Sequence, residues 1–111
     1  MTVIIAHTGK TAIKELATQR LEQVFHTVDS IKSDLQKCTK FRSEDKSFWA
    51  NNIKWQWDAK TKMLKRNAKG ILENVTDFYV TFFPDANSVL YRIEVSKKEQ
   101  IRGYIFLLNL V

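Results

Sequence analysis

A chain of 111 residues with 44% hydrophobic and 12% aromatic residues, three Gly and one Pro, is long enough for one folded domain and too short for two. Its composition excludes a disordered chain. The formal net charge of +6 favours an anionic partner, either nucleic acid or an acidic protein surface, so we expect a single domain over residues 1–111 with such a partner.

The first residues predict a strand. TVIIAH, at positions 2–7, is apolar and β-branched, too short for a signal-peptide core and without a preceding basic residue. The longest apolar run, IFLLNLV at the C-terminus, falls short of the roughly 20 residues that a membrane helix needs. We therefore expect a soluble cytoplasmic protein, or a phage or mobile-element product, with no membrane partner.

A helix is predicted from about residue 11 to 39. Its apolar residues recur at alternating spacings of three and four, which is typical of one buried helix face. Thr, Asp and Ser within 26–30 could cap a second helix, so one long or two consecutive helices are both open. The stripe favours packing on the protein's own sheet, although the same spacing permits a homodimer through a short coiled coil. Its residues are Ile13, Ala17, Leu21, Val24, Val28, Ile31, Leu35 and Cys38.

After a loop-like stretch at 40–47 the period becomes two. In FWANNIKWQWD, residues 48–58, alternation places Trp49, Trp55 and Trp57 on one face and Lys54 on the other. MLKRNA returns as a second strand, and VTDFYVTFF, VLYRIEVS and IRGYIFLLNLV follow as three more, separated by turn residues at 84–88 and 97–100. The predicted fold class is α+β: an N-terminal strand, the helices, then a mainly antiparallel meander of about five strands with the helices on one face.

All of the excess charge lies between residues 46 and 70. This segment has seven basic residues and one acidic residue, Asp58, while the rest of the chain has 11 of each. A concentrated basic hairpin predicts contact with a phosphate backbone; the alternative is a solvated hairpin whose lysines protect a sheet edge. The predicted binding residues are Lys54, Lys60, Lys62, Lys65, Arg66 and Lys69.

Two arginines form a second candidate site. If the last two strands pair across the turn at 97–100, Arg92 and Arg102 share one face and could hold a phosphate together. Glu94 lies on that face as well, so a surface ion pair is the alternative.

No complete catalytic or cofactor motif is present. Gly9-Lys10-Thr11 matches the end of a phosphate-binding loop, but the first glycine of that motif would fall on Ile4. One Cys and two His provide no ligand set spaced for zinc. We therefore expect no cofactor and no metal, and the catalytic residues of any enzymatic activity stay unassigned.

The order of elements, with IKELATQRLEQVF in the helical region and VLYRIEV as a central strand, resembles the RelE/ParE superfamily of toxins, many of which cleave messenger RNA on the ribosome. WQWDAKTKMLKRNAKGI is similar to the opening of the BrnT branch. Members usually carry further catalytic or basic residues after the last strand, whereas this chain ends in IFLLNLV. The resemblance implies a metal-independent ribonuclease.

Three hypotheses follow. The leading one is a non-enzymatic protein that binds RNA, or a nucleoprotein, through the basic hairpin. The second is the toxin-like ribonuclease. The third is a phage or mobile-element inhibitor that presents its basic patch to an acidic surface of a host protein.

Overall fold

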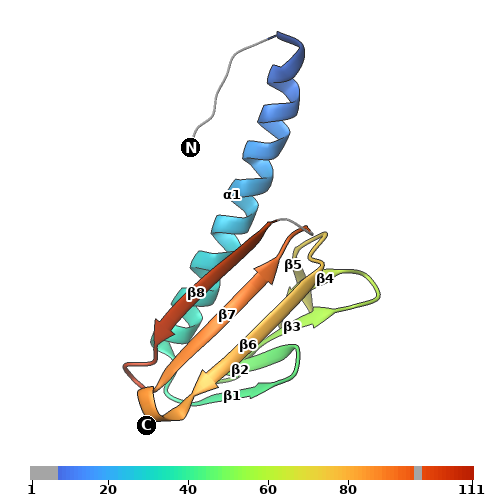
Figure 1. The fold of residues 1–111 in the computed structure, drawn as a ribbon. Helices are drawn as coiled ribbons and strands as arrows, with labels where there is room; N and C mark the ends of the chain where they lie inside the picture. Colours follow the sequence, from blue (N-terminus) through green and yellow to red (C-terminus); the bar gives the residue numbers. More distant parts are fainter. Residues whose placement is uncertain (1–7, 97–98) are drawn as a thin grey trace.

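One long helix and two antiparallel sheets make up this α+β protein (Figure 1). The computed structural model describes residues 8–96 and 99–111, with side chains described from residue 20. The elements are α1 (Thr8–Lys37), β1 (Phe41–Glu44), β2 (Ser47–Ala50), β3 (Ile53–Asp58), β4 (Met63–Arg66), β5 (Lys69–Leu72), β6 (Asp77–Phe83), the short helix η1 (Pro84–Ala86), β7 (Ser88–Glu94) and β8 (Gln100–Phe106). The predicted strand at 2–7 lies outside the described residues.

The helix α1 is unbroken through residues 26–30, which answers the question that the sequence left open. The apolar stripe faces the core, since Val24, Ile31, Leu35 and Cys38 are fully buried and Val28 packs against them. Burial raises the pKa of the Cys38 thiol, as expected for a core residue.

The strands form two sheets where a single meander of about five was predicted. Their orders are β1-β2-β3-β4-β5 and β6-β7-β8. The sheets approach each other where β1 and β2 contact β6, and α1 contacts β5 and β8, the strands at the opposite edges (Figure 1). The helix therefore spans the side on which the two sheets do not meet.

Two predictions about residues 40–58 were wrong. The stretch 40–47 was expected to be a loop, but it contains β1 and the turn into β2. The segment 48–58 is two strands joined by a turn at Asn51 and Asn52, with Asn51 at a φ of 57°. This tight hairpin pairs Trp49 with Lys54 and Phe48 with Trp55, so Trp49 lies on the outer face, opposite Trp55.

The core lies between the two sheets and the helix. Trp55 is fully buried, as predicted, and its ring stacks on that of Phe48 with centroids 6.3 Å apart. Trp57 is half-buried, and its indole N–H donates to the Val75 carbonyl at 2.8 Å. Burial of such rings contributes roughly 25 cal/mol per Å² of apolar surface.

The last residues return to the end of the helix. The Asn109 side-chain amide donates to the Gln36 carbonyl at 2.8 Å, and the Val111 N–H donates to the Thr39 carbonyl at 2.9 Å. These bonds fix the segment after β8 beside the C-terminal end of α1.

Candidate nucleic-acid interface

Arg66, one of the predicted binding residues, is engaged inside the fold. It pairs across the sheet with Trp55 and so faces the helix. Its Nε and Nη2 donate to the two carboxylate oxygens of Asp34 at 2.8 and 3.0 Å, and the Trp55 indole N–H donates to the same carboxylate at 2.7 Å. The hydrogen bond to Asp34 raises the pKa of the Arg66 guanidinium above its ordinary value. Through these hydrogen bonds Asp34 fastens α1 to β3 and β4.

The predicted lysines are divided between the two ends of the sheet. Lys54 is the second residue of β3, beside the Asn67 turn, and Lys69 pairs with Arg66 near the same end. Lys60 and Lys62 occupy the β3–β4 turn at the opposite end and are exposed. The structure therefore does not bring all six basic residues into one patch.

Lys65 lies on the outer face between these ends, where it pairs with an acid. Its ammonium is 3.2 Å from the Asp58 carboxylate. The Lys60 backbone N–H and the Lys65 ammonium hold the pKa of Asp58 below its ordinary value. Among the described residues, the lysines 54, 60, 62 and 69 form no ion pair, so their charges are not neutralised within the protein.

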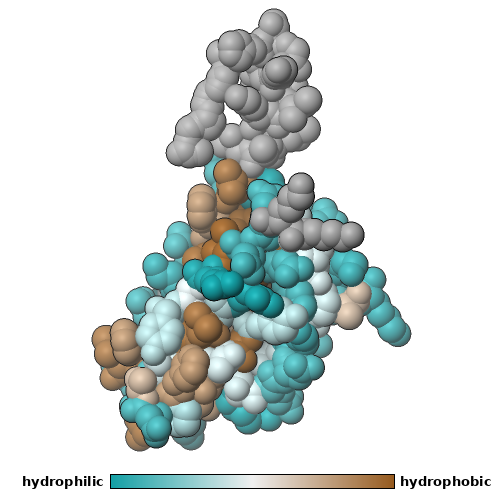
Figure 2. Space-filling model, in the orientation of Figure 1, coloured by the Kyte–Doolittle hydropathy of each residue, from teal (hydrophilic) through white to brown (hydrophobic). Residues whose placement is uncertain are grey.

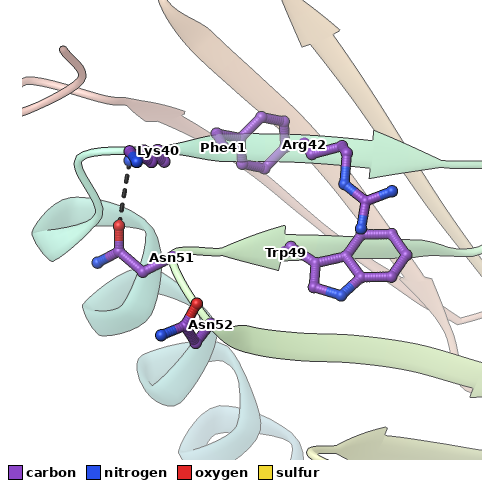
Figure 3. A pocket seen from close by; sticks show the side chains of 6 residues that line it. All are labelled: Lys40, Phe41, Arg42, Trp49, Asn51 and Asn52. Atoms are coloured by element: carbon purple, nitrogen blue, oxygen red, sulfur yellow. Dashed lines mark hydrogen bonds between the residues drawn. The ribbon is translucent and has the colours of Figure 1, made fainter.

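The hairpin turn at residues 51 and 52 creates a row of cations around a tryptophan. Arg42, Trp49 and Lys54 are neighbours across β1, β2 and β3 on the outer face. The Arg42 guanidinium carbon lies 3.7 Å from the Trp49 ring centroid (Figure 3). The Lys54 ammonium lies 5.0 Å from the same centroid. The ring attracts both cations, which restricts their side chains before any ligand arrives.

A shallow pocket adjoins this row. It is lined by Lys40, Phe41, Arg42, Trp49, Asn51 and Asn52 (Figure 3), a set that includes no carboxylate. The Asn51 side-chain oxygen accepts the backbone N–H groups of Thr39 and Lys40 at 3.0 and 3.1 Å, which fixes the chain that presents Lys40. The pocket therefore offers cationic and amide donors to an anion.

Sequence reasoning missed Lys40, Arg42 and Trp49. The first two fell in the stretch assigned to a loop, and Trp49 was assigned to the inner face. The signal was Asn51-Asn52, because asparagine tolerates the left-handed conformation that short hairpin turns require. Reading a turn there would have moved Trp49 to the face of Lys54.

Arg92 and Arg102 occupy the other sheet and lie directly opposite each other on β7 and β8. Neither forms an ion pair among the described residues; Glu94 instead accepts the Thr76 hydroxyl at 3.1 Å. The Arg92 guanidinium carbon lies 4.1 Å from the Tyr79 ring centroid. The expected proximity of the two arginines is confirmed.

The described residues also bear on two other features, metal sites and membrane-spanning helices. Within it, no group of three or more His, Cys, Asp or Glu residues could hold a metal ion, and no helix has the length and apolar character of a membrane span. No protein-family model, curated protein or solved structure matches the chain.

Proposed function

We propose that the protein binds nucleic acid, with RNA as the leading candidate, through the outer face of β1, β2 and β3. The observation that carries this proposal is the grouping of Arg42 and Lys54 around Trp49, beside a pocket that Lys40 also lines and that has no carboxylate. Cations that neutralise phosphates release condensed counterions, which drives association without regard to base sequence.

The arrangement suits phosphates for two further reasons. Arg42 can present two parallel N–H groups to one phosphate, which a lysine cannot do. Because the Trp49 ring already restricts Arg42 and Lys54, less side-chain entropy is lost when a ligand binds. The nearest acids on this outer face are Glu44, two residues after Arg42 on β1, and Asp58, at the opposite end of β3 from Lys54.

The salt dependence of affinity tests the proposal. If Lys40, Arg42 and Lys54 each neutralise one phosphate of a single strand, log affinity should fall against log salt with a slope of about −2, from roughly −0.7 per phosphate. Fluorescence anisotropy with labelled oligonucleotides of unrelated sequence measures the slope, and the sequences should differ little in affinity.

Matched variants identify the surface. Lys54→Ala and Arg42→Ala should each make the slope shallower by roughly 0.7, whereas Lys32→Ala, which removes an exposed lysine of α1, should leave it unchanged. A slope near zero, or equal effects of Lys54→Ala and Lys32→Ala, would refute the proposal. Cleavage of the RNA during the assay would instead favour the ribonuclease that the toxin resemblance implies.

A further inference from the structure

The outer face of β6, β7 and β8 carries large apolar side chains that the fold leaves uncovered. We call Tyr79, Phe83, Leu90, Tyr104 and Phe106 the aromatic face. They are between 37% and 53% exposed, whereas the inward residues of the same strands are buried or half-buried. Figure 2 views this side, and apolar residues gather over its lower part, around the start of β7 and the end of β8.

The rings are held in defined positions. The Tyr104 ring centroid lies 5.2 Å from that of Phe106, nearly at right angles, and 6.2 Å from that of Phe83. The Tyr104 hydroxyl is hydrogen-bonded at 2.7 Å to the hydroxyl of Ser88, a fully buried residue. These contacts fix Tyr104 as a partly exposed ring, 50% accessible, on a rigid strand.

Positive charge lies directly beside the rings. Arg102 is two residues from Tyr104 on β8, roughly 6.6 Å along the strand. Arg92 of β7 lies directly opposite Arg102. The Arg92 Nε is buried and has no hydrogen-bond partner, and among the described residues Arg92 forms no ion pair with a carboxylate. The acids of the same face, Asp77 and Glu94, form the row beyond the arginines; Asp77 is paired with Lys46 at 2.8 Å.

Strands β1 and β6, at the edges of the two sheets, pack together through inward-facing rings. The Phe41 ring of β1 packs on the Phe82 ring of β6, with centroids 5.0 Å apart. The end of β1 that carries Lys40 and Arg42 therefore lies beside the end of β6 that carries Phe83.

We infer that the aromatic face stacks unpaired bases of single-stranded nucleic acid while Arg92 and Arg102 contact its phosphates; this inference rests on the proposed function. Exposed rings on a sheet beside cations are the combination that binds single strands, because every base offers a flat face. Bases within a duplex are already stacked and cannot reach the rings. An apolar protein partner would bury both arginines without a counter-charge, at a cost in free energy.

The test compares a single-stranded 12-mer with a hairpin duplex of the same sequence, by anisotropy at fixed salt. Tyr104→Ala and Phe106→Ala should each weaken single-strand binding roughly 5- to 100-fold and change duplex binding less than about twofold. Leu108→Ala is the matched control, because Leu108 is 84% exposed just after β8 and outside the aromatic face. Circular dichroism establishes that each variant is folded, and Tyr104→Phe, which keeps the ring, should retain most of the affinity.

Several outcomes separate this inference from the proposed function. Unchanged single-strand affinity in Tyr104→Ala and Phe106→Ala would overturn the stacking role, while a retained effect of Lys54→Ala would leave the phosphate interface standing. Loss of self-association in Tyr104→Ala, with nucleic-acid affinity unaltered, would also overturn it and assign the face to a second copy of the chain. Absence of any nucleic-acid binding by the wild-type protein would refute both.

Discussion

Replacing Asp34 by Ala should destabilise the protein by about 2–4 kcal/mol, as estimated from the groups that it would leave without a partner. The Trp55 indole N–H belongs to a fully buried residue, and an unsatisfied buried donor costs roughly 1–3 kcal/mol. Loss of one partner of a buried ion pair costs roughly 3–5 kcal/mol. Only part of that applies here, because the Arg66 side chain is 37% exposed, against 11% for Asp34, and can regain water.

Urea unfolding followed by far-UV circular dichroism measures this loss. The control is Asp29→Ala, which removes an exposed acid of the same helix; its free energy of unfolding should stay within about 0.5 kcal/mol of wild type. A double-mutant cycle with Arg66→Met isolates the pair, and its coupling energy should exceed about 1 kcal/mol. A loss below about 1 kcal/mol in Asp34→Ala, or additive effects in the cycle, would refute the view that this network fastens the helix to the sheet.

Two further changes test the local geometry. Arg66→Glu should lower the urea concentration at the unfolding midpoint, because it sets a second carboxylate against Asp34. Lys62→Glu, in an exposed turn, should leave the midpoint nearly unchanged. Equal midpoints for the two variants would place Arg66 on the surface. Ala68→Gly should stabilise the protein by roughly 0.5–1 kcal/mol, because Ala68 is exposed and has a φ of 69°. Ala59→Gly, at an exposed position without a positive φ, should not stabilise it, and equal thermal shifts would contradict the backbone argument.

Periodicity predicted the elements that are long and regular. The alternating spacing of three and four located α1, and the last three strands appear close to where alternation and turn residues placed them. Their pairing also set Arg92 opposite Arg102 as expected. These features depend on neighbours within a few residues, or on a strand next along the chain.

The candidate site depended on information that local patterns carry weakly. A two-residue turn inside an alternating stretch reverses the face of every residue before it, and this moved Trp49 beside Arg42. The ion pair that removes Arg66 from the surface joins it to Asp34, 32 residues earlier. The packing of the two sheets against each other likewise depends on contacts between β1 and β6, which no local motif encodes.

The position of the helix between β5 and β8 has a consequence for the order of folding. During synthesis α1 is made before every strand of the described chain, yet β8, one of the strands that it contacts, is made last. The apolar residues Val24, Ile31 and Leu35 therefore stay partly uncovered until nearly all of these strands exist. Contacts between residues so distant in sequence slow folding. Apolar surface that stays exposed before β8 packs on α1 promotes aggregation. The packing of β8 on α1 is therefore the step at which folding competes most directly with misassembly.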